Sequence, residues 1–142
     1  MAVDFAEFLR EIRSSPGYAG QIVHAEEIPA REAVYGELAE PLPGAIRGAL
    51  ATLDIDALYS HQTEAIGNLR AGRHTAIVTG TASGKTLCYN LPVLERLLAR
   101  PEAKALYLFP TKALAQDQMR GLRRLAESHP KLAGLVKCGT YD

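Results

Sequence analysis

Apolar residues recur every three to four positions in several stretches of this chain, the spacing that gathers side chains on one face of an α-helix. In the first stretch Phe5, Phe8 and Ile12 share such a face, and Pro16-Gly17 ends it. Ser60 is the predicted N-cap of the third stretch. The predicted helices span residues 4–14, 43–53, 60–69, 84–99 and 110–128.

Shorter apolar runs separate the later helices. Residues 75–78 and 104–109 read as strands, and the second run is apolar almost throughout, as in a strand buried on both faces. Residues 135–139 are a third strand candidate. Strands that alternate with helices at this spacing indicate right-handed crossovers and a parallel sheet. We therefore expect an α/β fold over residues 56–142, with ligands beyond the carboxyl ends of the strands.

The N-terminal part of the chain has a different character. Residues 16–44 are rich in proline and glycine and contain no long periodic run, so they predict an extended segment. Together with the first two helices they form a helical and extended N-terminal segment, residues 1–55, ahead of the α/β region.

Composition and charge narrow the class of protein. Of the 142 residues, 47% are hydrophobic and 23% are charged, as in folded globular proteins. The net charge is zero, yet residues 1–60 carry six more acidic than basic side chains and residues 96–142 carry five more basic than acidic ones. This asymmetry indicates a C-terminal half that faces a polyanion, although a solvated helical face gives the same pattern.

Cysteine usage and the absence of targeting signals favour a cytoplasmic location. Cys88 and Cys138 lie far apart and form no C-x-x-C pair, which suits a reducing compartment. No apolar run approaches the roughly 18 residues of a membrane span, and the acidic N-terminus lacks the features of a signal peptide. The four histidines show no metal-binding spacing, and we interpret each as structural or exposed.

The strongest chemical signal is the stretch Val78–Thr86, which reads Val-Thr-Gly-Thr-Ala-Ser-Gly-Lys-Thr. Small residues let backbone N–H groups surround an anion, and the helix that follows adds its N-terminal dipole. A lysine at that helix terminus is unfavourable for the dipole, so it calls for a bound anion. Lys85 would reach the β- and γ-phosphates of a nucleotide, and Thr86 would ligate Mg²⁺.

The stretch departs from the general phosphate-loop pattern at one position. That pattern has glycine six positions before the lysine, where this chain has Thr79. A glycine-rich turn between a strand and a helix can also be a plain connection. The loop by itself does not distinguish a kinase, a transporter ATPase, a GTPase and a helicase.

A second stretch, residues 58–62, bears on the identity of the nucleotide. The carboxamide of Gln62 can donate to and accept from the N6/N7 edge of adenine, which guanine would not match. The ring of Tyr59 can stack on the base. Taken alone, Gln62 is more often a surface residue and Tyr59 more often part of a core.

A third stretch, residues 110–118, reads Pro-Thr-Lys-Ala-Leu-Ala-Gln-Asp-Gln and opens a helix. The helix N-terminus, the hydroxyl of Thr111 and the ammonium of Lys112 could grip a phosphodiester backbone, and Gln116 lies one turn further along. Taken alone, this stretch is a solvated amphipathic helix.

Together the three stretches resemble the superfamily-two DEAD/DEAH-box helicases. Residues 58–62 look like the adenine-reading Q motif, 79–86 like motif I and 110–118 like motif Ia. Helicases of this superfamily often lack the first glycine of the general pattern. The wording Thr-Gly-Thr-Ala-Ser-Gly-Lys-Thr-Leu-Cys-Tyr and the final Gly-Thr-Tyr-Asp resemble the bacterial mitomycin-repair branch, which is similar to the yeast RecQ-like DNA helicases.

The resemblance implies an incomplete RecA-like P-loop domain of an ATP-driven motor that moves along single-stranded DNA, 3′ to 5′. Lys85 and Thr86 are then the catalytic candidates, with ATP and Mg²⁺ as cofactors. The expected nucleotide-binding residues are Tyr59, Gln62, Gly80, Thr81, Ala82, Ser83, Gly84, Lys85 and Thr86. The implied DNA-binding residues are Thr111, Lys112 and Gln116.

Hydrolysis needs parts that this sequence lacks. Phosphoryl transfer to water requires a carboxylate that helps hold Mg²⁺, a group that orients the water and an arginine on the transition state. The resemblance implies an Asp-Glu-x-His box for the first two, and no Asp-Glu dipeptide occurs here. We therefore expect an N-terminal fragment of a longer helicase, which binds ATP weakly and neither hydrolyses it nor unwinds DNA alone.

Two other classes remain open at this point. The chain could be a non-enzymatic nucleotide-binding remnant, or a half-domain that cannot fold alone because a truncated parallel sheet exposes an edge. It could also be a different P-loop protein, such as a small kinase. The kinase alternative gives Gln62 no role and so predicts equal affinity for ATP and GTP.

Overall fold

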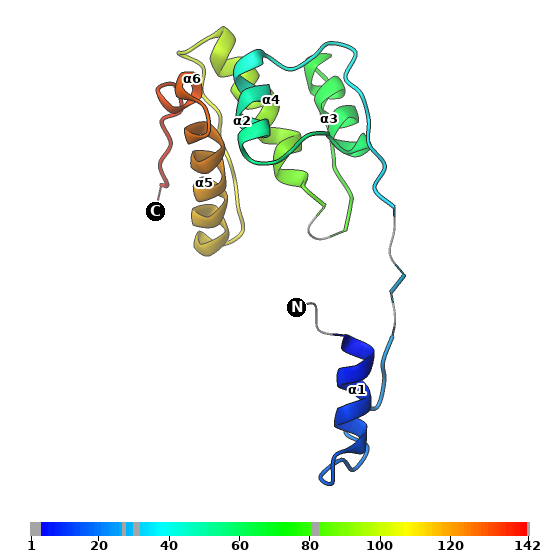
Figure 1. The fold of residues 1–142 in the computed structure, drawn as a ribbon. Helices are drawn as coiled ribbons and strands as arrows, with labels where there is room; N and C mark the ends of the chain where they lie inside the picture. Colours follow the sequence, from blue (N-terminus) through cyan, green and yellow to red (C-terminus); the bar gives the residue numbers. More distant parts are fainter. Residues whose placement is uncertain (1–3, 27, 30–31, 81–82, 142) are drawn as a thin grey trace. The chain divides into compact units, whose positions relative to one another are not determined.

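The computed structural model describes residues 4–26, 28–29, 32–80 and 83–141. They form two compact units, Met1–Glu32 and Ala33–Asp142, and each is described by itself (Figure 1). The predicted domain boundary between residues 55 and 56 stays a prediction. The second compact unit begins earlier, at Ala33, and includes the helix Gly44–Thr52 that precedes this boundary. No helix among the described residues is long and apolar enough to cross a membrane.

The first unit is built around helix α1, Phe5–Ser14. Asp4 caps it, because its Oδ1 accepts hydrogen bonds from the backbone N–H groups of Ala6 at 3.0 Å and Glu7 at 3.3 Å. The rings of Phe5 and Phe8 lie 6.0 Å apart and both are exposed. The predicted first helix is confirmed, but none of its residues is buried.

The second unit contains the remaining helices. They are α2 (Gly44–Thr52), α3 (Ser60–Arg70), α4 (Lys85–Ala99), α5 (Lys112–Glu127) and the short α6 (Pro130–Ala133). The first four match the predicted helices to within two residues, and α6 was not predicted. The predicted N-cap Ser60 is wrong. Tyr59 occupies that position, because the side chain of Gln62 folds back and accepts its backbone N–H at 2.8 Å.

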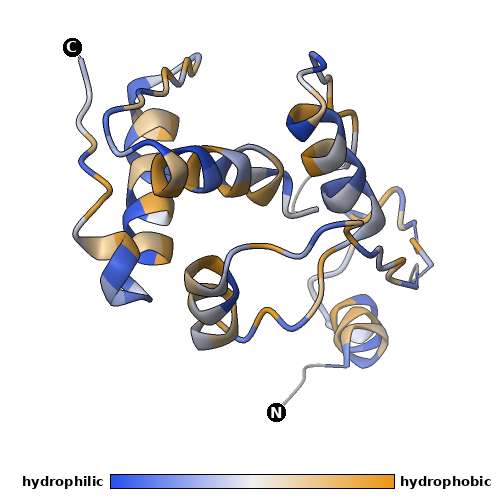
Figure 2. Ribbon diagram, turned by 90° about the horizontal axis from the view of Figure 1, so that it is seen from above, coloured by the Kyte–Doolittle hydropathy of each residue, from blue (hydrophilic) through white to orange (hydrophobic). Residues whose placement is uncertain are grey.

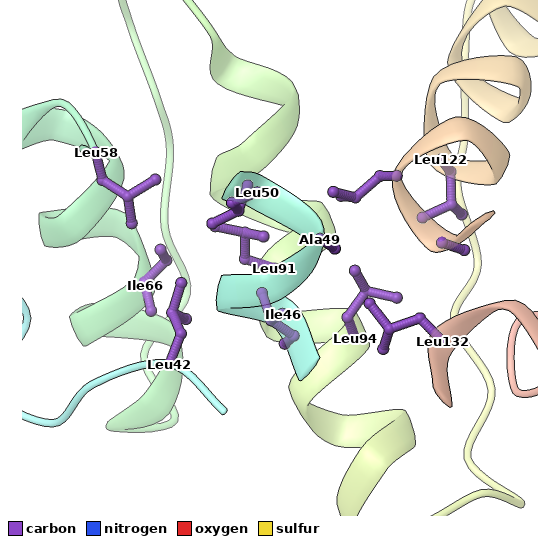
Figure 3. Packing of buried hydrophobic residues seen from close by; sticks show 12 residues of the cluster. Leu42, Ile46, Ala49, Leu50, Leu58, Ile66, Leu91, Leu94, Leu122 and Leu132 are labelled. Carbon is purple, nitrogen blue, oxygen red and sulfur yellow. The ribbon is translucent and has the colours of Figure 1, made fainter. Parts of the chain in front are cut away.

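The core of this unit gathers around α2 (Figure 3). Ile46 on α2 lies between Ile66 of α3 and Leu122 of α5, and Leu91 and Leu94 of α4 belong to the same cluster. Ile46, Ile66, Leu91 and Leu94 are all fully buried. Figure 2 shows hydrophobic and hydrophilic residues on each of these helices, as expected for amphipathic helices that cover a common core.

An ion pair ties α3 to α4 at the edge of the core. The Arg70 guanidinium donates to both carboxylate oxygens of Glu95, at 3.1 and 2.5 Å, and also to the backbone carbonyl of Glu40. The hydrogen bond to Glu95 raises the pKa of Arg70, although partial burial opposes it. Two parallel bonds to a carboxylate fix the relative position of the two helices.

The predicted strands are the main departure from expectation. Residues 73–80 and 103–109 have no regular secondary structure, and Figure 1 draws them as long unwound segments. Within the described residues, the β-pairing is one isolated antiparallel bridge between Tyr35 and Tyr59. The parallel sheet is therefore not confirmed.

Burial along these segments nevertheless alternates with the period of a strand. Tyr107 is half-buried, whereas Leu106 and Leu108 on either side of it are 86% and 84% exposed. Ile77 is half-buried and Val78 is 94% exposed. Tyr107 packs against the helical core while Leu106 and Leu108 are bare, so the predicted burial of 104–109 on both faces is wrong. A strand needs backbone partners from a distant segment, and the described part of the chain supplies none to these two segments.

Candidate nucleotide-binding site

Lys85, the first residue of α4, is surrounded by oxygens of the loop before it. Its Nζ donates to the backbone carbonyl and the hydroxyl of Thr79, both at 3.0 Å, to the Ser83 hydroxyl at 3.2 Å and to the carbonyl of Gly80. These are neutral acceptors. Phosphate oxygens carry charge and form stronger hydrogen bonds with an ammonium group, so they can replace the loop oxygens. The predicted site residues Thr81 and Ala82 lie outside the described residues.

Thr79 has a definite role in this loop. Its hydroxyl lies 2.6 Å from that of Ser83 and accepts from Lys85. The side chain that departs from the general pattern is thus part of the network that holds the lysine. Sequence reasoning treated Thr79 only as a missing glycine.

Gly84 joins the loop to α4 and tolerates no side chain. Its φ is 73°, in the left-handed region that glycine adopts without strain. A Cβ at this position would lie 2.5 Å from Nε2 of Gln62. Both the backbone conformation and the close approach therefore require glycine.

Gln62 is the residue that approaches Gly84, from 22 positions earlier in the chain. Its Nε2 donates to the Gly84 carbonyl at 2.9 Å, and its Oε1 accepts from the backbone N–H of Tyr59 at 2.8 Å. The side chain is only 2% exposed. One amide hydrogen and one lone pair remain for a base, but a base can reach them only after the site opens.

Tyr59, whose backbone N–H bonds to Gln62, belongs to a group of three stacked rings. The ring of Tyr59 stacks with that of Tyr35 at 5.4 Å and with that of His61 at 5.7 Å. Tyr35 is 59% exposed, so this end of the stack is open to solvent. Because Tyr59 already stacks with two rings, a base meets the group of three rings and not Tyr59 alone.

Sequence reasoning missed Tyr35 and His61. The Nε2 of His61 lies 2.9 Å from the carbonyl of Ser83, so this nitrogen carries the hydrogen and donates it. His61 adjoins Gln62 at the start of α3, and that position was a usable signal. Tyr35 gave none, because its place depends on the bridge to Tyr59.

Thr86 follows Lys85 and is the predicted Mg²⁺ ligand. Its hydroxyl donates to Oε1 of Gln118 on α5 at 3.3 Å, which leaves its lone pairs unused by that bond. Mg²⁺ prefers oxygen ligands and is commonly held by few protein groups together with waters and phosphates. A single hydroxyl beside a phosphate loop fits that requirement. Among the described residues, no cluster of three or more histidine, cysteine or acidic side chains could hold a metal alone.

Cys88 and Asn90, further along α4, are buried. Cys88 is fully buried, and burial raises the pKa of its thiol, which agrees with its interpretation as a small packed side chain. The Tyr107 hydroxyl donates to Oδ1 of the buried Asn90 at 3.0 Å, and burial raises the pKa of Tyr107 to about 12. These contacts fix α4 against the segment 103–109.

The predicted nucleic-acid residues lie at the start of α5. Thr111 is the N-cap, and its hydroxyl accepts the backbone N–H of Leu114 at 3.2 Å. Lys112 and Gln116 are exposed and four positions apart, so they share a face of the helix. The structure thus brings these three residues together at one end of α5, while Gln118 on the same helix contacts Thr86 of α4.

Comparison with known proteins identifies the family. The family model described as DEAD/DEAH box helicase matches residues 59–140. The chain is 40% identical to the ATP-dependent helicase hrq1 of Schizosaccharomyces pombe over 99% of its own length, and 44% identical to the ATP-dependent helicase YprA of Bacillus subtilis over 85%. It spans only 14% and 16% of these relatives.

Solved structures agree with this relationship. The chain resembles the DUF1998 helicase MrfA bound to DNA, with a TM-score of 0.73 and 39% identity over 91% of this chain and 18% of that one. The same helicase bound to DNA and AMPPNP gives a TM-score of 0.72 at 41% identity, over 87% and 17% of the two chains. These likenesses fit a fragment of an α/β helicase fold. The chain belongs to the DEAD/DEAH box helicase family.

Proposed function

We propose that this chain supplies the ATP-binding part of an ATP-dependent DNA helicase, acting in the cytoplasm. The observation that carries the proposal is the lysine at the start of α4, held by loop oxygens that phosphate can replace. The relatives named as ATP-dependent helicases, and the similar helicase crystallised with AMPPNP, support ATP as the nucleotide.

Nucleotide binding proceeds by exchange of partners in this site. The phosphates replace the Thr79 and Ser83 oxygens on the Lys85 ammonium, and the loop N–H groups at the start of α4 face the same anion. Thr86 supplies a hydroxyl to Mg²⁺, which neutralises phosphate charge when bound. Gln62 opens from its buried position and offers its free amide hydrogen and lone pair to adenine.

The bare faces of residues 75–78 and 104–109 support a parallel sheet in the complete helicase lobe. Each segment already has the alternating burial of a strand, with Val78, Leu106 and Leu108 exposed. Apolar residues placed this way are covered when neighbouring strands and helices are present. The sheet would place the phosphate loop and the start of α5 at one edge.

Nucleic acid binds at the start of α5 in this proposal. Lys112 contributes charge, Gln116 an amide on the same face and Thr111 a hydroxyl that can still donate its hydrogen. The similar helicase bound to DNA supports DNA as the partner, and we propose single-stranded DNA. Hydrolysis and unwinding are functions of the whole helicase, because this sequence contains no Asp-Glu dipeptide to complete the Mg²⁺ site.

Nucleotide preference tests the proposal without any substitution. We expect the purified chain to bind ATP about tenfold or more tightly than GTP in calorimetric titrations, because guanine presents the wrong groups to a glutamine amide. A thermal melt with each nucleotide is the parallel measurement, since a ligand that binds the folded state raises the melting temperature. Equal affinities would point to another kind of P-loop protein, such as a small kinase.

A further inference from the structure

Gln118 lies where α5 meets the phosphate site on α4. Its side-chain Oε1 accepts a hydrogen bond from the Tyr89 hydroxyl at 2.7 Å and one from the Thr86 hydroxyl at 3.3 Å. Both donors lie on α4, so one amide oxygen joins the two helices at two points. An amide oxygen has two lone pairs, and these two bonds use both of them.

The Tyr89 side of this junction is well fixed. The Tyr89 ring meets that of Tyr107 edge to face at 5.8 Å, and Tyr107 is in turn bonded to the buried Asn90. The shorter of the two bonds to Gln118 therefore comes from a ring whose position is set by packing. The amide of Gln118 is held from that side and presents its oxygen to Thr86.

The hydrogen bond to Gln118 determines which part of the Thr86 hydroxyl remains available to a ligand. A threonine hydroxyl has one hydrogen to donate and two lone pairs to offer, and the hydrogen rotates to whichever acceptor is near. A cation binds to a lone pair of the hydroxyl oxygen and is repelled by the hydroxyl hydrogen. Once the hydrogen is directed at Gln118, the lone pairs of Thr86 remain for a cation.

We propose that Gln118 is a positioning residue for Thr86, which it orients as a ligand for the Mg²⁺ that accompanies the nucleotide. This inference rests on the proposed function. Groups that hydrogen-bond to a metal ligand orient it and raise its affinity, and their loss commonly weakens metal binding by roughly 10- to 100-fold. The long 3.3 Å bond places the expected effect at the lower end of that range.

The test compares ATP affinity in Mg²⁺ and in EDTA. Gln118→Met keeps the length of the side chain and removes the acceptor, so we expect about a tenfold loss of the Mg²⁺-dependent gain in ATP affinity. Affinity in EDTA should stay within about twofold of the unaltered chain. The double variant with Thr86→Ala should bind no more weakly than Thr86→Ala alone, because Gln118 acts through that hydroxyl.

Three further variants distinguish a positioning role of Gln118 from a purely structural one. Gln118→Glu keeps an oxygen acceptor and should retain the Mg²⁺ effect. Tyr89→Phe leaves Gln118 in place but removes its anchor, and should give a smaller loss that is again confined to Mg²⁺. Gln21→Leu removes a glutamine amide in the other unit of the chain and should change neither affinity. The Tyr89 variant keeps the test available if Gln118→Met does not fold.

The possible results are distinguishable from a failure of the proposed function. No ATP binding by the unaltered chain would overturn the proposed function. ATP binding strengthened by Mg²⁺, with the whole gain kept in Gln118→Met, would overturn only the role of Gln118. Equal losses in Mg²⁺ and EDTA, or additivity with Thr86→Ala, would likewise show that Gln118 is merely structural.

Discussion

Helix α4 and the segment 103–109 that follows it are both rich in apolar residues, but these residues are buried on the helix and largely exposed on the segment. Leu91 and Leu94 on α4 are fully buried, whereas Leu106 and Leu108 on the segment are 84–86% exposed. A helix satisfies its backbone N–H and C=O groups within its own length, so its apolar face is free to pack at once. A strand depends on partners elsewhere, and those are absent from the described chain. Identical side chains therefore contribute very different amounts to stability.

A pair of leucine truncations gives the largest expected contrast. Leu91→Ala should lower the free energy of unfolding by about 2–5 kcal/mol, because it removes a fully buried side chain and leaves a cavity. Leu106→Ala should change it by less than about 0.5 kcal/mol, because the side chain is already in water. Urea unfolding measures both. Similar losses for the two variants would break the comparison and show that the segment is paired in solution.

A pair of glycine substitutions asks how tightly the phosphate loop is held. Gly84→Ala and Gly72→Ala both place a Cβ at a φ near 72°, which costs about 1–2 kcal/mol. Only at Gly84 does the new Cβ approach another residue, Nε2 of Gln62 at 2.5 Å. Gly84→Ala should therefore lower the free energy of unfolding by about 1 kcal/mol more than Gly72→Ala does.

The urea unfolding midpoints of Gly84→Ala and Gly72→Ala measure this difference in stability. Equal losses would mean that Gln62 does not lie against the loop in solution. ATP affinity gives a second reading, since only the Gly84 variant disturbs the phosphate site and should bind ATP more weakly.

Two ion pairs provide a smaller contrast within the helices. Arg70 and Glu95 form a bidentate pair in which their side chains are 24% and 17% exposed. Glu95→Gln breaks this pair and should lower the free energy of unfolding by about 1 kcal/mol. Asp117→Asn breaks a bond to Arg120 in a pair that is 69% and 64% exposed, and should change it by about 0.3 kcal/mol or less. A loss that is larger for Asp117→Asn than for Glu95→Gln would contradict the assignment of Arg70–Glu95 as the tie between α3 and α4.

The last contrast depends on pH and concerns the half-buried face of the segment 103–109. Burial raises the pKa of Tyr107 to about 12, above the ordinary value near 10. The folded chain then holds this proton more strongly than the unfolded chain, so its stabilising contribution is complete below pH 10. It is lost as the pH rises from about 10 to 12. Stability should fall over that interval and fall less in Tyr107→Phe, as followed by circular dichroism.

The helices were predictable because their information is local, and the apolar spacing located α2 to α5. The phosphate site over Gly80–Thr86 rests on an equally local pattern and stays a prediction. Contacts between distant segments were not predictable. The hydrogen bond from Gln62 to the Gly84 carbonyl joins residues 22 positions apart, and the stacking of Tyr35 on Tyr59 joins residues 24 positions apart.

The predicted strands depend on partners that a local sequence pattern does not reveal. The residue pattern of 104–109 predicts a strand buried on both faces, whereas the segment has no regular secondary structure and Tyr107 lies half-buried between two exposed leucines. The pattern cannot say whether a partner strand is present. Gln118 shows the same limit at the site, because its contact with Thr86 joins residues 32 positions apart.

ATP binding by the purified chain and by Lys85→Ala tests the central claim most directly. Lys85 is held by four oxygens of the loop, and its replacement removes the only positive side chain placed among them in the described residues. We expect saturable ATP binding that Mg²⁺ strengthens, and a loss of about tenfold or more in Lys85→Ala, because hydrogen bonds between charged groups are the strong ones. Unchanged ATP affinity in Lys85→Ala, in a variant that still melts cooperatively, would contradict the assignment of this loop as the nucleotide site.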